Sequence, residues 1–104
     1  MRDLAELRQE IDEIDAQMVK LFEQRMAVSE EVAEYKVAVG KKILDKEREK
    51  LKIQAVKSMT CNEFNSHGVE ELYNQIMAMS RKLQYQRMEQ QVIGRLPFVM
   101  ADQI

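Results

Sequence analysis

No glycine or proline occurs between Met1 and Val39, and this uninterrupted stretch limits the folds open to the chain more than any other feature. Most of its residues are strong helix formers, and apolar side chains recur in alternating steps of three and four, as on one face of an α-helix. This apolar seam comprises Leu4, Leu7, Ile11, Ile14, Met18, Leu21, Val28, Val32, Tyr35 and Val39. The pattern predicts one helix over residues 3–38, ended by Gly40 and on the order of 55 Å long.

Two further helices are expected in the rest of the chain, over residues 45–58 and 69–91. The stretch 61–68 (CNEFNSHG) between them has the composition of a loop, with Asn65 or Ser66 able to cap the third helix. The apolar face of that helix comprises Val69, Leu72, Ile76, Met79 and Leu83. No comparable strand pattern or internal repeat is evident, so the predicted fold class is all-α, with three helices per chain and one of them very long.

A chain of 104 residues is expected to form one domain. We assign residues 1–91 to a helical domain and residues 92–104 (VIGRLPFVMADQI) to an apolar C-terminal tail. The sequence leaves open whether this tail packs on a dimer, closes over a site, is the stub of a fusion or makes a regulatory contact.

Composition argues against several classes of function. Sixteen basic against eighteen acidic residues give a net charge of −2, which disfavours a nucleic-acid binder that relies on bulk positive charge. One cysteine and one histidine are too few for an intrachain disulfide or a Cys/His zinc site. No apolar run approaches the roughly 20 residues of a membrane span, and the N-terminus MRDLAELRQE is too charged for a signal peptide. The cytoplasm is therefore the expected location.

The long first helix predicts a partner chain. The second and third helices together hold about 37 residues, too few to cover both ends of the first unless they lie end to end along it. Val19, Phe22 and Met26 add apolar surface beside the seam. Because a stripe of this length is usually buried by another chain, we expect a homodimer of interlocked helices.

Polar residues near the core-facing positions are the candidates for chemistry. Arg25 stands where the seam predicts an apolar side chain, Lys36 lies eleven residues later near the same line, and Arg8 lies beside the seam. Taken singly, such cations are often only long side chains that reach solvent.

The other two helices add polar residues at helical spacing. Asp45, a predicted N-cap, shares one face with Arg48 and Glu49. Ser80 and Gln84 lie one turn apart on the third helix. A charged first turn and polar residues beside the core are the ordinary explanations. Together, however, these positions describe a helix-lined pocket for a small polyanion, because buried cations are costly unless an anion neutralises them.

The sequence offers no nucleophile paired with a base, since Cys61 and His67 both fall in the predicted loop. It also contains no glycine-rich phosphate loop and no metal-ligand cluster. Any catalysis is therefore expected to rest on binding and electrostatics, with no metal or other cofactor.

Four segments resemble, in order and with compatible spacing, the all-α (type II) class of chorismate mutase: LRQEIDEIDAQMVKLFEQRM, VAEYK, ILDKEREK and SRKLQ. The resemblance covers about residues 3–88. Each segment alone is a short motif in a charged helical protein, but the agreement in register outweighs the ordinary explanations given above. The positions that match the family's site are Arg8, Arg25, Lys36, Asp45, Arg48, Glu49, Ser80 and Gln84.

The resemblance implies an intertwined homodimer with two equivalent active sites, each built from both chains. The reaction it implies is the rearrangement of the dicarboxylate chorismate to prephenate, on the way to phenylalanine and tyrosine. By analogy, Arg8 of the other subunit, Arg25 and Arg48 hold or support the carboxylate-binding part of the pocket.

The remaining matched residues receive roles by the same analogy. Lys36 and Gln84 would donate hydrogen bonds to the ether oxygen, Glu49 and the Asp45 region would receive the ring hydroxyl, and Ser80 would contact a carboxylate. The residues expected to act in catalysis itself are Lys36, Gln84, Arg25 and Glu49.

Two other functions fit part of the pattern. An enzyme like isochorismate pyruvate-lyase would share the fold and the cationic pocket, but the complete D-x-x-R-E segment and the Ser80/Gln84 pair favour the mutase. A non-catalytic helical module for regulation or dimerisation would be expected to lose pocket residues, and all eight matched positions keep a suitable type.

Overall fold

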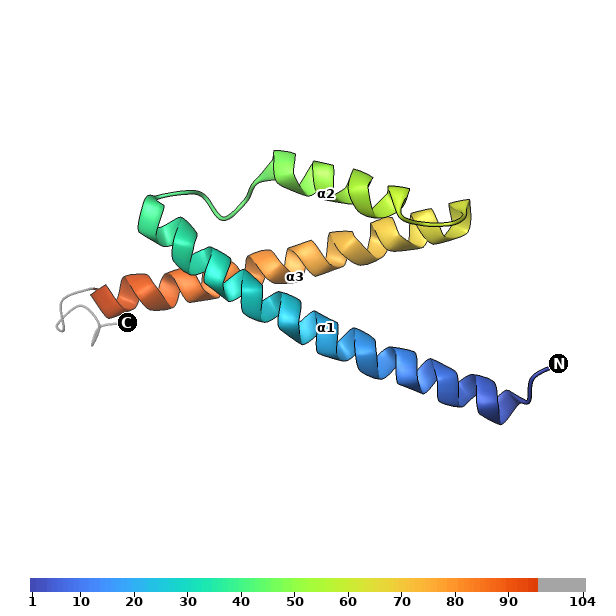
Figure 1. Cartoon of the computed structure of the whole chain (residues 1–104). Helices are drawn as coiled ribbons and strands as arrows, with labels where there is room; N and C mark the ends of the chain where they lie inside the picture. The colour runs from blue at the N-terminus through green and yellow to red at the C-terminus, as the bar shows by residue number, and fades with distance from the viewer. Residues whose placement is uncertain (96–104) are drawn as a thin grey trace.

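The computed structural model describes residues 1–95, which form three α-helices and no strand. The helices are α1 (Leu4–Val39), α2 (Lys46–Ser58) and α3 (Glu63–Arg95) (Figure 1). The predicted all-α class is confirmed. Residues 96–104 of the predicted tail lie outside the described residues, and α3 runs four residues beyond the expected end at residue 91.

The ends of α1 follow the sequence closely. Asp3 caps its first turn, and the Asp3 side chain accepts a hydrogen bond from the backbone N–H of Ala5. Gly40 ends the helix in the left-handed conformation, at φ 75°, which a residue without Cβ adopts at little cost. The N–H of Gly40 bonds to the carbonyl of Val37 and the N–H of Lys41 to that of Lys36, at 2.8 Å for the latter, so two of the last carbonyls of α1 are satisfied.

The start of α2 agrees with the prediction, but the start of α3 does not. Asn62 caps α3: its side chain accepts from the N–H of Asn65 at 2.7 Å, and its carbonyl accepts from the N–H of Ser66 at 3.0 Å. The expected loop at 61–68, with its cap at Asn65 or Ser66, was therefore wrong in all but its first residues. Gly68 lies inside the helix, where it costs up to about 1 kcal/mol relative to alanine, a cost that tertiary packing readily offsets.

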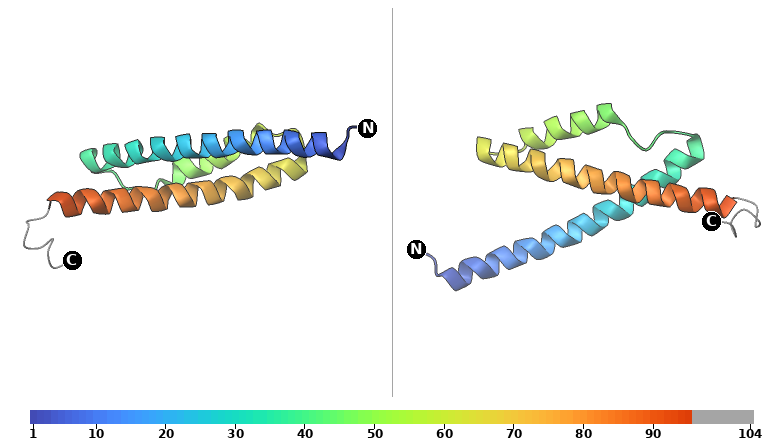
Figure 2. Two further views of the ribbon diagram at one scale, coloured as in Figure 1. Left: turned by 90° about the horizontal axis from the view of Figure 1, so that it is seen from below. Right: turned by 180° about the vertical axis from the view of Figure 1, so that it is seen from behind.

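Both α1 and α2 pack against α3. In Figure 1, α1 crosses α3, and its N-terminal half then runs away from the other two helices. The hydroxyls of Ser29 and Ser80 hydrogen-bond across the α1–α3 contact. The result is an elongated body of 68 × 31 × 19 Å, whose two long helices diverge on either side of that crossing (Figure 2).

The core of the single chain is small and lies near the crossing. Its buried apolar residues are Ala33, Ile43, Val56 and Met77, and its buried polar residues are Ser29, Ser80 and Gln84. Every residue from 1 to 24 is exposed, so the first half of the apolar seam is not covered by its own chain. On α3 the fully buried stripe is the one that carries Met77, Ser80 and Gln84, while Leu72 and Met79 of the expected apolar face remain exposed.

An ion pair joins α2 to α3 near their connection. Lys57 Nζ donates to Glu70 Oε2 at 2.8 Å. This hydrogen bond and the positive charge of Lys57 hold the pKa of Glu70 below its ordinary value of 4.5. Within the described part of the chain, none of the helices is long and apolar enough to cross a lipid bilayer.

Candidate active site

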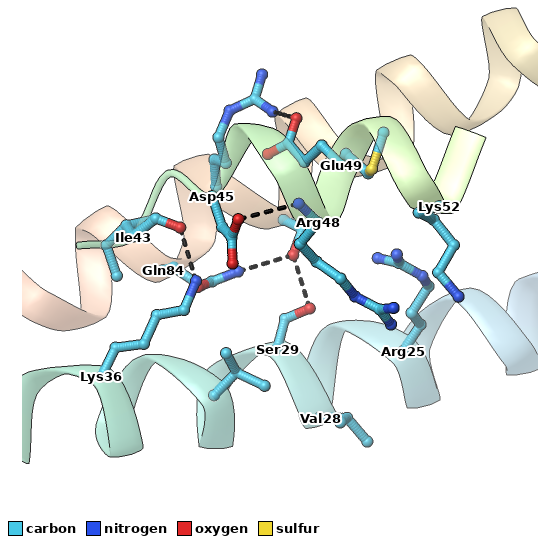
Figure 3. Close-up of a pocket in the computed structure, with 14 residues that line it drawn as sticks. Arg25, Val28, Ser29, Lys36, Ile43, Asp45, Arg48, Glu49, Lys52 and Gln84 are labelled. Carbon is cyan, nitrogen blue, oxygen red and sulfur yellow. Dashed lines mark hydrogen bonds and ion pairs between the residues drawn. The ribbon is translucent and has the colours of Figure 1, made fainter. Parts of the chain in front are cut away.

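A pocket of about 330 Å³ lies where the three helices meet (Figure 3). Its size falls at the lower end of the range typical of small-molecule sites. Its walls come from the second half of α1, the α1–α2 connection, the first turns of α2 and the middle of α3. The lining residues are Arg25, Val28, Ser29, Val32, Lys36, Ile43, Asp45, Arg48, Glu49, Lys52, Met77, Ser80, Arg81 and Gln84.

Seven of the eight residues singled out from the sequence lie in this lining. The exception is Arg8, which sits on the exposed N-terminal half of α1 and does not reach the pocket of its own chain. Arg25 and Lys36 are eleven residues apart, so both project from one side of α1.

The pocket is positively charged although the chain as a whole is not. Five cationic and two acidic side chains line it, an excess of three positive charges, against a net −2 for the whole chain. Of the five, Arg81 pairs with Glu49 across α3 and α2. The other four cations form no ion pair with any carboxylate in the described part of the chain, an arrangement that favours an anionic ligand.

Lys36 is held in place by the connection between α1 and α2. Its Nζ donates to the carbonyl oxygen of Ile43 at 2.7 Å, and Ile43 itself is buried. An ammonium group has three donors, so two remain for a ligand. Figure 3 shows the ends of the Lys36 and Gln84 side chains pointing toward one another in the pocket.

The first turn of α2 supplies both carboxylates. The Asp45 side chain accepts the backbone N–H of Arg48 at 3.0 Å and so caps the helix. Glu49 lies one turn later and is fixed by its ion pair with Arg81 of α3. The cap therefore sets where α2 begins, and with it the direction in which Arg48 and Glu49 project.

A buried hydrogen-bonded group closes the floor of the pocket between α1 and α3. Gln84 Nε2 donates to Ser80 Oγ at 3.0 Å, and Ser80 Oγ lies 2.7 Å from Ser29 Oγ. Each of these residues is 7% exposed. Gln84 Oε1 is buried and has no hydrogen-bond partner among the described residues. A buried polar atom without a partner is uncommon in folded proteins and is typical of functional sites.

Arg25 stands between the pocket and a second, apolar groove. Its guanidinium lies 5.9 Å from the centre of the Tyr73 ring on α3, within the range of a cation–π contact. On the other side of this pair the groove, of about 390 Å³, separates α1 from α3. Besides Arg25 it is lined by Met18, Val19, Leu21, Phe22, Leu72, Tyr73, Ile76 and Met79.

Three polar lining residues were not predicted from the sequence: Ser29, Lys52 and Arg81. Ser29 and Lys52 each lie one helical turn after a predicted residue, Arg25 and Arg48 respectively, and Arg81 directly follows another. Extending each predicted position by one turn along its helix would have identified the first two. Nothing in the local pattern indicates Arg81, because its partner Glu49 belongs to a different helix.

The pocket presents fixed cations, a paired carboxylate and neutral hydrogen-bonding groups, an arrangement suited to a small ligand with more than one carboxylate. No group of three or more His, Cys, Asp or Glu side chains within residues 1–95 is placed to hold a metal ion. Fold and pocket together define the class: an all-α protein whose helices surround a pocket with an excess of positive charge.

Comparison with known proteins narrows this class to one family. Residues 7–85 match the sequence model of the family described as Chorismate mutase type II. A chorismate mutase from Methanocaldococcus jannaschii is 35% identical over 92 residues, and the match covers 84% of this chain and 89% of the relative. The chain belongs to the type II chorismate mutase family.

Proposed function

We propose that the protein is an isomerase that rearranges chorismate to prephenate in the pocket between its three helices. The observation that carries the proposal is the gathering of seven matched side chains around one cavity with excess positive charge. These side chains come from three helices and span residues 25–84, so the grouping depends on the tertiary fold. With a single cysteine and no disulfide to maintain, the protein suits the cytoplasm, the location we propose for this activity.

The cations on α1 and α2 are proposed to hold the two carboxylates of the substrate. Arg25 and Arg48 each offer a planar fork that matches a carboxylate in bidentate fashion. Ser80, in the floor of the pocket, adds a hydroxyl. Binding both carboxylates at once favours the folded conformer in which the two reacting carbons meet, which lowers the entropic part of the barrier.

Lys36 and Gln84 are proposed to stabilise the transition state. As the C–O bond breaks, negative charge grows on the ether oxygen, and donors already aimed at that oxygen bind the transition state more strongly than the substrate. Lys36 is held by the Ile43 carbonyl, and Gln84 is 7% exposed and hydrogen-bonded to Ser80. Both donors are thus held in place before the substrate arrives, as this kind of catalysis requires.

Glu49 and the Asp45 region are proposed to accept the ring hydroxyl of the substrate. The ion pair with Arg81 keeps Glu49 from folding onto the cations that must remain free for the carboxylates. The rearrangement moves electrons within one molecule and transfers no proton to the protein. The chain therefore needs no nucleophile, base or cofactor for it.

The active unit is proposed to be a homodimer, with Arg8 contributed from the second chain. Two observations support it: residues 1–24 are all exposed despite their apolar seam, and an apolar groove stands open between α1 and α3. The N-terminal half of a second α1 is an apolar element suited to such a groove. Arg8 would then reach the partner's pocket, where it adds a further cation for a carboxylate.

The first experiment follows the loss of chorismate absorbance and identifies the product, for the wild type and for Arg25→Ala. Prephenate formation that falls at least 100-fold in the variant is expected, since a fixed donor to the reacting substrate is lost. Lys50→Ala, on α2 but outside the lining, is the matched control and should keep full activity. A wild type that leaves chorismate unchanged would contradict the proposal and direct the search to isochorismate.

The second experiment tests Arg8 and the dimer together by mixing two inactive variants, Arg8→Ala and Lys36→Ala. If Arg8 acts across the interface, each mixed dimer has one intact site, and random pairing restores about one quarter of the wild-type activity. If Arg8 acts within its own chain, or not at all in the site, mixing restores nothing beyond the average of the two variants.

A further inference from the structure

Ser29 is a buried polar residue that none of the roles above uses. It lies on α1 one turn after Arg25, is 7% exposed and lines the pocket. Its Oγ is 2.7 Å from Ser80 Oγ, an ordinary distance for a hydrogen bond between two hydroxyls. Either oxygen can be the donor, and the choice decides what Ser80 can offer to a ligand.

The direction of this hydrogen bond matters because Ser80 has only one hydroxyl proton to donate. A hydroxyl has one proton to donate and two lone pairs with which to accept. Ser80 Oγ already accepts an N–H from Gln84. When Ser80 donates to Ser29, its only proton is used inside the protein. When Ser29 donates to Ser80, both lone pairs of Ser80 are occupied and its proton remains free for the pocket.

A carboxylate in the pocket selects between these two arrangements. An ionised carboxylate only accepts hydrogen bonds, so it interacts favourably with Ser80 only when the Ser80 proton is free. A hydroxyl that accepts two hydrogen bonds is also polarised into a better donor. When Ser29 donates to Ser80, Ser80 no longer spends its proton on Ser29. Ser80 can then donate that proton to the anion.

We propose that Ser29 is a positioning residue, which directs the hydroxyl of Ser80 toward a substrate carboxylate by donating its own proton to Ser80 Oγ. The proposal rests on the proposed function, because it takes the bound anion to be a carboxylate of chorismate. Ser29 does not touch the substrate in this scheme. Its effect passes through Ser80, and the Ser80 bond to Gln84 keeps that carboxamide oriented at the same time.

The competing explanation is that the Ser29 hydroxyl bonds only to the backbone of its own helix and has no influence on Ser80. A buried helical serine can donate to the carbonyl four residues before it, here that of Arg25, without any effect on the pocket. The two explanations differ in kinetics. The charge of the carboxylate is the same in substrate and transition state, and Arg25 and Arg48 would still hold the substrate in its folded conformer. A weaker contact from Ser80 is therefore expected to raise KM and to leave kcat nearly unchanged.

The test compares Ser29→Ala, Ser80→Ala and the double variant. Alanine is the best helix former, so α1 is expected to fold without the Ser29 hydroxyl. Ser29→Ala should raise KM for chorismate by up to about ten-fold with kcat within about two-fold, and should have no further effect when Ser80 is already alanine. The matched control is Ser58→Ala, which removes a serine hydroxyl bonded to a backbone carbonyl outside the pocket. A KM equal to that of the control, or an equal rise in both backgrounds, would overturn the proposal, as would a fall in kcat at unchanged KM.

A second readout does not depend on turnover of chorismate. The side-chain amide signals of Gln84, observed by ¹⁵N–¹H NMR, should shift in Ser29→Ala, because the Ser80 hydroxyl that accepts from Gln84 loses its own donor, but only while Ser80 is present. Ser58→Ala should leave them unchanged. If the wild type does not convert chorismate, the proposed function fails while this coupling of Ser29 to Gln84 can still be observed. If the Gln84 signals are insensitive to Ser29, the positioning role fails, whatever the substrate.

Discussion

The two halves of α1 have the same apolar periodicity, yet only the second half has buried residues and lines the pocket. Residues 4–24 are exposed throughout, with Leu4 at 57%, Ile11 at 55% and Leu21 at 62% exposure. Residues 25–39 contain Ala33 at 0% and the buried Ser29, and they form one wall of the pocket, although their own seam residues, Val28, Val32, Tyr35 and Val39, stay exposed as well. In this half the single chain therefore buries a line of small residues beside the seam rather than the seam itself. Helical periodicity therefore identifies a face that favours burial, and only the rest of the fold decides what lies against it.

The two halves also differ in the polar residues that lie in or beside the seam. In the exposed half the seam is uniformly apolar, as expected of a surface that packs against another chain. In the second half the seam is interrupted by Arg25, and Ser29 and Lys36 lie close to it. Changes in the second half should thus alter each chain regardless of protein concentration, whereas changes in the first half should alter association.

The largest effect is expected from Lys36→Ala in the second half. Loss of the charged donor that we propose for the ether oxygen should lower kcat by a factor of about 10² to 10³, at every protein concentration. Steady-state kinetics on chorismate measures it, and Lys41→Ala, a lysine beyond the end of α1 and outside the pocket lining, serves as the control. Activity within a few-fold of the wild type would remove Lys36 from the reaction.

The next effect belongs to the exposed half. Ile14→Asp places a charge in the apolar seam and should dissociate the dimer, with activity at least about ten-fold lower at dilute protein and partly recovered at high concentration. Size-exclusion chromatography should show the 12.2 kDa monomer for this variant and a dimer for the wild type. Ala16→Asp places the same charge off the seam and should change neither property. A wild type that elutes as a monomer with full activity would refute the dimer.

A smaller and pH-dependent effect is expected from Gln84→Glu. A neutral carboxamide donates at any pH, whereas a carboxyl group donates only when protonated, so activity should decline about ten-fold per pH unit above the pKa of the new side chain. The pH profile of kcat/KM measures this, with Gln86→Glu, an exposed site on the same helix, as the control. An unchanged profile would remove Gln84 from the ether-oxygen role.

The smallest effect concerns stability and lies outside both halves of α1, in the ion pair between α2 and α3. Lys57 lowers the pKa of Glu70, so the pair stabilises the fold above the ordinary carboxyl pKa of 4.5 and this contribution is lost as the pH falls through the lowered value. Glu70→Gln should lower Tm at pH 7 by a few degrees at most and should converge with the wild type near pH 2. Calorimetry at several protein concentrations should give the same difference, and Glu71→Gln should give none.

Much of the fold was predictable because its signals are local. The span of α1, the end at Gly40 and the cap at Asp45 all depend on residues within one or two turns of each other, and all are confirmed. The start of α3 was missed because Asn62 caps a turn that contains several residues typical of loops. Residues 63–68, including Gly68, are helical because the packing of the long helix α3 outweighs their own weak helix propensity.

The candidate site was predictable in its members but not in its contacts. Resemblance in register indicated seven of the residues that line the pocket, and the periodicity of α1 indicated the sides from which Arg25 and Lys36 project. The ion pair of Glu49 with Arg81 and the bond of Ser29 to Ser80 join positions 32 and 51 residues apart. No local spacing rule reaches across such separations, so these contacts appeared only with the structure.

The sequence by itself determined that the chain is helical, where α1 and α2 begin and end, and that a cationic group of residues interrupts an apolar seam. These properties depend on backbone preferences and on spacing along one helix, which are short-range. The tertiary structure decided which stripe of α3 is buried, which half of α1 stays exposed throughout and that Arg81 pairs with Glu49. Burial and charge pairing depend on how helices cross, and a crossing is set by side chains far apart in the sequence.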